Sequence, residues 1–323
     1  MKIHSVAIAA VILSVTSIAE ACFAETYPSK PIRLIVPSGA GGAPDVRARW
    51  LAEKLRAGLG QPIIVENKPG ASSILGTLTV TQSRPDGYTI LLSHQGIMAL
   101  NPHLHANLPY DPFKDLMPVS RLVVSPMILV VHPDVPVRSV ADLVRLAKEK
   151  PGQLNFGSPG VGTPPHMAGA LFKRSAHIDV NNVAYRSTPS LLIDLIGGRL
   201  TYAFDSLASV LPHIRGGTLR PLAVTSPKRV ASLPDVPTVA ETIPGFEYWS
   251  WMGICVPAGT PKAIVMRLNQ ELNRILGTQE ARDWFAEQGG EPIVETPEEF
   301  DAYIRKEHAY WGKVIRETGM KIE

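Results

Sequence analysis

Cysteine is nearly absent from this chain: its 323 residues include only Cys22 and Cys255. We expect Cys22 to be removed with an N-terminal leader, which leaves Cys255 without a partner for a disulfide. A lone cysteine also excludes a cysteine-rich metal site. The chain should therefore tolerate an oxidising compartment without using disulfides there, and we expect neither a metal ion nor a cofactor.

An excess of charge of one sign is also missing. The 32 Lys and Arg residues nearly balance the 29 Asp and Glu residues, for a formal net charge of +3. No block of basic residues with interleaved aromatics occurs, so we expect no nucleic-acid partner. Beyond residue 24 no apolar run reaches the length of a membrane span, so we expect none in the mature chain.

Signatures of common enzyme classes do not occur either. The chain has no G-x-S-x-G, H-E-x-x-H or S-x-x-K motif and no G-x-G-x-x-G dinucleotide loop. Gly157 and Gly162-Thr163 have the spacing of a phosphate loop, but Pro164 stands where that loop needs lysine. These absences disfavour a nucleotide site and favour a protein without catalysis.

The N-terminus has the features of a cleavable secretory signal. Lys2 supplies a positive start, residues 6–18 form an apolar stretch, and Cys22-Phe23-Ala24 ends in a small residue. Glu20 precedes the only cysteine that could carry a lipid and makes a poor lipid-attachment box. We therefore expect residues 1–24 to be a signal peptide removed after Ala24.

Strand and helix signals alternate through the rest of the chain, which predicts an α/β fold with two mainly parallel sheets. Two strands, 123–132 and 249–256, look like crossings between domains. We therefore predict a discontinuous first domain of residues 25–124 and 250–323, and a second domain of residues 125–249. The expected strands are 32–36, 63–65, 88–93, 127–132, 154–157, 180–185, 200–204, 219–225, 251–256 and 292–295.

Three turns between a strand and a helix are the candidate binding elements, at residues 37–45, 157–166 and 185–189. A helix start exposes unpaired N–H groups and the positive end of the helix dipole, which suits an anion. Micromolar affinity needs about 8 kcal/mol, and each hydrogen bond to a charged group contributes about 1.5–3 kcal/mol. Several such bonds would suffice, so we predict that the turns converge on one small anion; the alternative is that each merely reverses the chain.

Three charged residues near these turns each admit more than one interpretation. Asp45 is better explained as a helix-start residue than as a ligand contact, since a carboxylate repels an anion. Arg186 is either a direct ion-pair partner of the ligand or a surface arginine. Asp205 either orients Ser187 or Thr188, accepts from a ligand hydroxyl or ammonium, or bonds its own backbone.

Taken together, motifs along the whole mature chain resemble the Bug (Bordetella uptake gene) family, the substrate-binding components of tripartite tricarboxylate transporters. The matching segments occur in the family's order, and their combination is specific where each alone is weak. They are residues 27–33, 40–45 with Ala48-Arg49, 65–71, 85–89, 110–115, 157–166, 194–198, 211–214 and 222–226.

The resemblance implies a two-domain, Venus-flytrap periplasmic binding protein (type II) without catalysis, which binds a small carboxylate in the interdomain cleft. Membrane transporter subunits are the implied partners, and a monomer is the implied state. Carried over position by position, the family's ligand-binding residues are Ser38, Ala43, Pro44, Ser158, Gly162, Thr163, His166, Arg186, Ser187 and Asp205.

Within these turns the chain departs from the family pattern. Ser38 replaces a commonly aromatic or apolar residue, Pro44 replaces Thr or Ser, and Ser187-Thr188 replaces a pair that often contains glycine. The ligand's identity therefore does not transfer from any relative. An alternative function is a sensor, in which the same fold binds a metabolite and then engages a signalling protein instead of a transporter. A secreted hydrolase, which would rest on Thr163 and His166, is a remote one.

Overall fold

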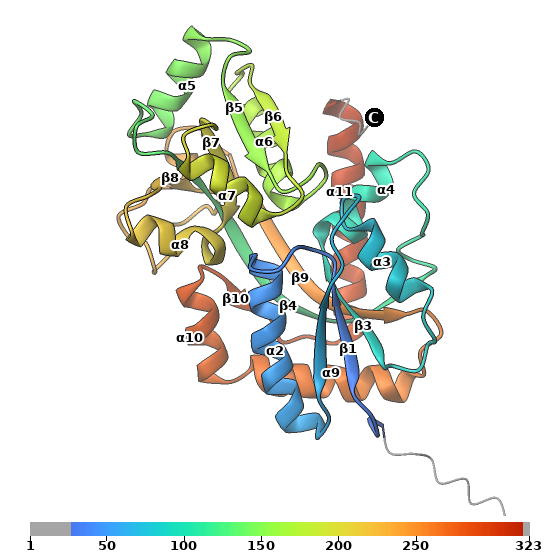
Figure 1. The fold of residues 1–323 in the computed structure, drawn as a ribbon. Coiled ribbons are helices and arrows are strands. Elements are labelled where there is room, and N and C mark those ends of the chain that lie inside the picture. The colour runs from blue at the N-terminus through green and yellow to red at the C-terminus, as the bar shows by residue number, and fades with distance from the viewer. Residues whose placement is uncertain (1–26, 319–323) are drawn as a thin grey trace, which may run out of the picture.

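The structure is a computed structural model that describes residues 27–318, so the predicted leader and its cleavage site lie outside the described residues. Ten strands form one continuous, curled sheet in the order β2-β1-β3-β9-β4-β7-β5-β6, with β10 and β8 also paired to β4 (Figure 1). The strands are β1 (Ile32–Val36), β2 (Ile63–Asn67), β3 (Thr89–His94), β4 (Leu116–Val131), β5 (Asn155–Ser158), β6 (Asn181–Ala184), β7 (Tyr202–Ser206), β8 (Arg220–Val224), β9 (Trp249–Pro257) and β10 (Glu291–Pro292).

Helices cover the sheet and alternate with the strands, as the sequence predicts. They are α2 (Ala43–Leu59), α3 (Ile74–Thr81), the π-helix η1 (Gly96–Leu100), α4 (Asn101–Leu104), α5 (Val140–Glu149), α6 (Pro164–Ser175), α7 (Thr188–Ile196), α8 (Leu207–Arg215), the 3-10 helix η2 (Val239–Glu241), α9 (Lys262–Leu276), α10 (Gln279–Glu287) and α11 (Pro297–Thr318). In the part of the chain that the structure describes, no helix combines the length and apolar character of a membrane span.

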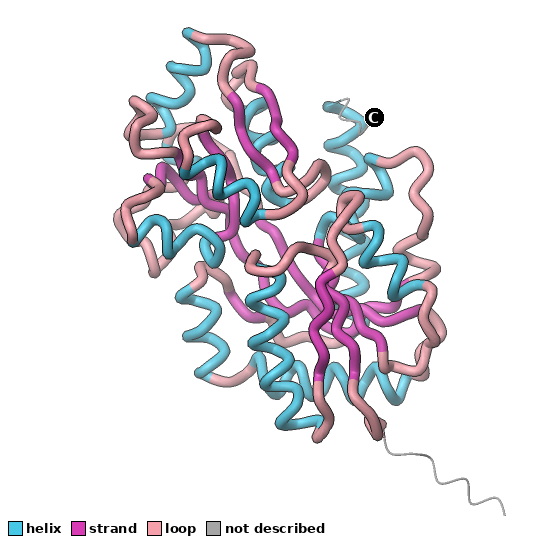
Figure 2. Tube along the Cα trace, viewed as in Figure 1, coloured by secondary structure: helices cyan, strands magenta, loops and turns pink. Residues whose placement is uncertain are grey.

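Strand β4 joins two lobes. Its first part, Leu116 to Pro126, pairs with β9, and its second part, Met127 to Val131, pairs with β7 and β8. The first lobe contains β1, β2, β3, β9 and β10 with the first part of β4, and the second lobe contains β5 to β8 with the rest (Figure 2). The strand is 16 residues long and starts before the predicted crossing of residues 123–132, because a proline such as Pro118 is unusual inside a strand.

Parallel and antiparallel pairs divide by position in the sheet. The outer strands pair in parallel, β1 with β2 and β3, and β5 with β6 and β7. The crossing strands pair antiparallel, β9 with β3 and β4, and β4 with β7, β8 and β10. The prediction of mainly parallel sheets therefore holds for the outer strands, whereas the junction is antiparallel because β4 and β9 run between the lobes in opposite directions.

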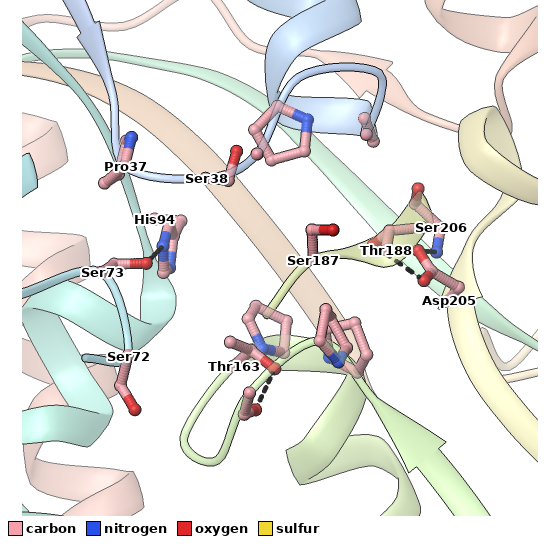
Figure 3. A pocket seen from close by; sticks show the side chains of 18 of the residues that line it. Pro37, Ser38, Ser72, Ser73, His94, Thr163, Ser187, Thr188, Asp205 and Ser206 are labelled. Carbon is pink, nitrogen blue, oxygen red and sulfur yellow. Dashed lines mark hydrogen bonds between the residues drawn. The ribbon is translucent and has the colours of Figure 1, made fainter. Parts of the chain in front are cut away.

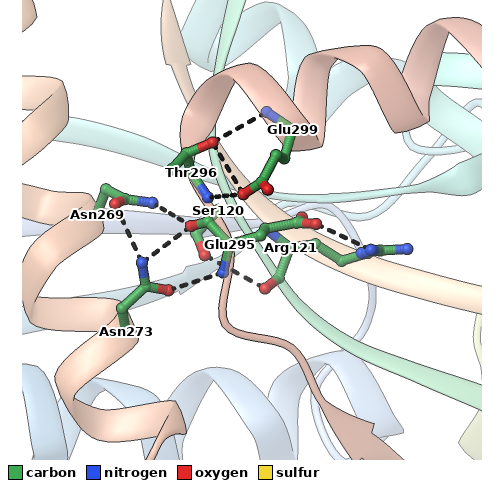
Figure 4. A network of polar contacts seen from close by, with 7 residues as sticks. All are labelled: Ser120, Arg121, Asn269, Asn273, Glu295, Thr296 and Glu299. Atoms are coloured by element: carbon green, nitrogen blue, oxygen red, sulfur yellow. Dashed lines mark hydrogen bonds and ion pairs between the residues drawn. The ribbon is translucent and has the colours of Figure 1, made fainter.

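A buried polar network anchors the first part of β4 to the helices behind it. The Asn269 side chain is 3% exposed, and its Nδ2 donates to the carbonyl oxygens of Val119 (2.8 Å) and Glu295 (2.9 Å). The Arg121 guanidinium forms an ion pair with the Glu295 carboxylate at 2.9 Å, and Asn273 Nδ2 also donates to the Glu295 carbonyl (Figure 4). One cluster thus ties β4, α9 and the start of α11 together.

Removing the central amide of this network should destabilise the fold. Asn269→Ala leaves two buried carbonyl oxygens with fewer donors, and we expect the free energy of unfolding to fall by about 2–4 kcal/mol. Denaturant unfolding measures the loss. The control is Gln279→Ala on the exposed face of α10, which should stay within about 0.5 kcal/mol of the unchanged protein; equal effects of the two changes would contradict the anchoring role.

Candidate ligand-binding site

A cavity of about 230 Å³ lies between the two lobes. The first lobe contributes the turn at residues 37–44, residues 70–73 and His94, and the second lobe contributes the turns after β5 and β6 together with the end of β7 (Figure 3). Met127 and Met252, on the crossing strands, also line it. The volume is below the range of about 300–1,000 Å³ that drug-sized ligands occupy, so the cavity suits a small organic molecule.

The structure brings most of the predicted site residues to this cavity. Those that line it are Ser38, Ala43, Pro44, Thr163, Arg186, Ser187 and Asp205. The Ser38 Oγ is a candidate contact, because Ser38 lines the cavity and its Oγ has no hydrogen-bond partner among the described residues.

Three predicted residues, Ser158, Gly162 and His166, do not line the cavity. Ser158 is fully buried on β5, and its Oγ is 2.9 Å from Asn182 Oδ1, to which it donates. The His166 Nδ1 accepts a hydrogen bond from the Gly162 N–H at 3.3 Å. The polar groups of these residues form hydrogen bonds with other residues of the protein. We therefore interpret them as residues that hold the second turn in its conformation.

Two N–H groups of the first turn have partners within the protein. The Gly41 N–H donates to Asp45 Oδ2 (2.9 Å), the Ala43 N–H donates to Ser209 Oγ (3.2 Å), and Pro44 has no N–H to offer. Asp45 therefore acts as a helix-start residue that holds the turn, in agreement with the sequence interpretation.

Some N–H groups at the other two turns also have partners within the protein. The Thr163 N–H donates to the Gly160 carbonyl at 3.3 Å, and prolines occupy positions 164 and 165. At the start of α7, the Ser190 N–H donates to Ser187 Oγ at 3.4 Å. These N–H groups are therefore used within the protein, and the hydroxyls of Ser38 and Ser73 are further candidate donors to a ligand.

Sequence reasoning missed a fourth loop, which contributes Ser72 and Ser73 to the cavity. Three consecutive non-glycine residues here adopt positive φ, Ala71 (47°), Ser72 (54°) and Ser73 (74°). Such angles are uncommon outside glycine and are concentrated at functional sites. Of this segment only Ala71 falls in the resembling stretch 65–71, and no sequence pattern signals this backbone conformation.

His94 orients the hydroxyl of Ser73. The Gly96 N–H donates to His94 Nδ1 at 3.0 Å, and His94 Nε2 is 3.0 Å from Ser73 Oγ. Burial lowers the pKa of His94 to about 4, so the ring is neutral near pH 7, and its one proton lies on Nε2. Ser73 therefore accepts from His94, and its own proton is free to donate to a ligand.

Asp205 is the acidic group of the cavity and is 3% exposed. Its carboxylate accepts from the Thr188 hydroxyl at 3.1 Å and from the Ser206 N–H at 2.7 Å. Burial raises its pKa to about 6 despite these hydrogen bonds. Asp205 thus orients Thr188, as one of the sequence interpretations has it, and it also presents an acceptor to the cavity (Figure 3).

The two lobes touch directly across the cavity. The Ser72 hydroxyl donates to the Val161 carbonyl at 2.6 Å, and the Ala43–Ser209 hydrogen bond also joins the lobes. A Cβ atom at Gly39 would lie 2.8 Å from Ser187 Cβ, so only glycine permits this approach. The structure therefore shows a closed arrangement of the lobes.

Comparison with known proteins agrees with this architecture. Residues 47–320 match the model of the tripartite tricarboxylate transporter family receptor (TctC), and the chain belongs to this family. Protein BugT of Bordetella pertussis is 35% identical over 98% of both chains.

Solved structures are similar over nearly the whole chain. An R. palustris structure with adipate has a TM-score of 0.88 at 34% identity, covering 91% of this chain and 98% of that one. MatC from Rhodopseudomonas palustris with bound malate has a TM-score of 0.84 at 28% identity, covering 90% and 100%. The fold is thus that of periplasmic binding proteins, and proteins in this group hold small carboxylates.

The raised pKa of Asp205 predicts a pH-dependent cost to stability. The pKa of the Asp205 carboxyl is ordinarily 3.8 and is about 6 in the folded protein. The stability that protonated Asp205 contributes to the fold is therefore fully present below pH 3.8 and is lost as the pH rises through about 6. We expect Asp205→Asn to raise the free energy of unfolding of the ligand-free protein by about 2–3 kcal/mol at pH 7.5. This gain should vanish near pH 4.

Urea unfolding at several pH values measures the effect, with Asp235→Asn on an exposed loop as the control. A less stable Asp205→Asn protein at pH 7.5 would contradict the prediction, because the hydrogen bonds of the carboxylate would then outweigh its burial.

Proposed function

We propose that this protein is a periplasmic solute-binding receptor that closes around one small carboxylate between its lobes. It would deliver this ligand to the membrane subunits of a tripartite tricarboxylate-type transporter. The observation that carries the proposal is the cavity between the lobes, which most of the predicted ligand-binding residues line, Ser38 with its unpartnered Oγ among them. Family membership and relatives with adipate and malate support it.

The proposed contacts come from both lobes. Ser38 and Ser73 donate from the first lobe, while Thr163 and Ser187 face them from the second, and Arg186 lies at the cavity as a cation. We retain the predicted leader, the division into residues 25–124 with 250–323 and 125–249, and the monomeric state as parts of the proposal. The crossing of β4 at Pro126 and Met127 supports the division.

The pair of Ser73 and His94 bears on the alternative of a hydrolase. A serine nucleophile needs a histidine nitrogen that accepts its proton, but the proton of neutral His94 lies on the nitrogen that faces Ser73, since Nδ1 accepts from Gly96. Thr163, the other candidate nucleophile, donates its hydroxyl proton to the Gly160 carbonyl at 2.6 Å. Both arrangements favour binding over hydrolysis.

A thermal-shift screen tests the function. The purified mature chain is heated with dicarboxylates, tricarboxylates, amino acids, nicotinate and phthalates, each in separate wells. A true ligand present at about 100 times its dissociation constant stabilises the protein by about 2.7 kcal/mol. The proposal fails if no acid shifts the melting temperature and mass spectrometry of the denatured protein releases no small acid.

Ser38→Ala should weaken the ligand found in this way without harming the fold. The Ser38 hydroxyl has no partner to lose in the ligand-free protein, so stability should be unchanged. Loss of a hydrogen bond to a charged group, worth about 1.5–3 kcal/mol, should weaken the affinity by about 10- to 100-fold in calorimetry.

Ser232→Ala is the matched control, because the Ser232 Oγ is also buried and unpartnered among the described residues but does not line the cavity. It should bind the acid as the unchanged protein does. Equal affinities of all three proteins would remove Ser38 from the site.

A further inference from the structure

Arg47 on α2 is a buried arginine without an acidic partner. Its side chain is 2% exposed, and among residues 27–318 it forms no ion pair. Nη2 donates to Ser125 Oγ at 3.2 Å, Nη1 approaches Met252 Sδ at 3.6 Å, and Nε has no partner. Burial lowers the pKa of Arg47 to about 10, so the guanidinium remains charged near pH 7.

Such an arrangement opposes folding. Removing a charge from water is expensive, and buried cations in proteins are normally paired with a carboxylate. Arg47 has only a hydroxyl, a thioether and the ring of Phe285 at 6.0 Å. Its charge is therefore poorly compensated within the described part of the chain.

The position of Arg47 suggests where the compensation comes from. Its two polar neighbours lie on the crossing strands, Ser125 on β4 and Met252 on β9. Met252 lines the ligand cavity, and so does Ser250, whose hydroxyl donates to the Ser125 carbonyl at 3.1 Å. The guanidinium thus lies directly behind the cavity wall, separated from the interior by the side chains of the crossing strands.

The cavity itself offers a bound anion little positive charge. Among the residues that the structure describes, Arg186 is the one arginine or lysine that lines the cavity, and that side chain is exposed. His94 is neutral near pH 7, and Asp205 is acidic. In a dry interior the field of a charge extends further than in water, so Arg47 is the buried group able to balance an anion in the cavity.

We propose that Arg47 is a specificity-determining residue, whose buried charge selects negatively charged ligands through the part of the cavity wall that Met252 and Ser250 form. This inference rests on the proposed binding of a small carboxylate. The bound anion and Arg47 would compensate each other, and the ligand-free protein would carry the unpaired charge at the expense of its stability.

Three variants test the proposal. Arg47→Met keeps the length of the side chain and removes its charge, and Arg47→Lys keeps the charge. Arg56→Met, on the exposed face of the same helix, removes one charge at the surface. Each is measured twice, by urea unfolding without ligand and by thermal shift with the same panel of acids, adipate and malate included.

We expect ligand-free Arg47→Met to be more stable than the unchanged protein and to bind the acid at least tenfold more weakly. Arg47→Lys should bind within a few-fold of the unchanged protein, and Arg56→Met should match it in both measurements. A merely structural role would instead lower the stability of ligand-free Arg47→Met, and this outcome would overturn the proposal.

Equal affinity of Arg47→Met and the unchanged protein for the acid would also overturn the role of Arg47, while the proposed function would stand. If no acid shifts the unchanged protein and none is released on denaturation, the proposed function fails and this inference fails with it. Binding of an acid by the unchanged protein therefore distinguishes a failure of the Arg47 proposal from a failure of the proposed function.

Discussion

The antiparallel pairing of β4 is the constraint on which the rest of the structure depends. The strand belongs to the sheet of the first lobe up to Pro126 and to that of the second lobe from Met127. Because its partners differ on the two sides, its path fixes how the lobes face each other. The Asn269 network holds the first part in place, and the cavity forms where the strand changes lobes.

This geometry explains why the site is built from turns that lie far apart in sequence. Each turn follows one of the outer parallel strands β1, β5 and β6, and the close approach of Gly39 to Ser187 lets the turns of the two lobes meet. The N–H groups of Gly41, Ala43 and Thr163 are used to hold the turns themselves. The cavity therefore presents hydroxyls on a rigid frame, which costs less reorganisation on binding than mobile side chains would.

Much of this could be predicted from sequence because it depends on local patterns. Strand β1 was predicted to the residue, and the turns at 37–45, 157–166 and 185–189 each contribute to the cavity. What could not be predicted depends on contacts distant in sequence. The orientation of Ser73 needs His94 and the positive φ of its own loop, and the burial of Arg47 needs β4 and β9 to pack over α2.

The most direct test of the account is a crystal structure of the mature chain with the acid that stabilises it most. The account predicts the acid between the closed lobes, with a carboxylate within hydrogen-bond distance of the Ser38 and Ser73 hydroxyls. An acid bound outside this cavity, or lobes that do not touch through Ser72 and Val161 when it is bound, would contradict it.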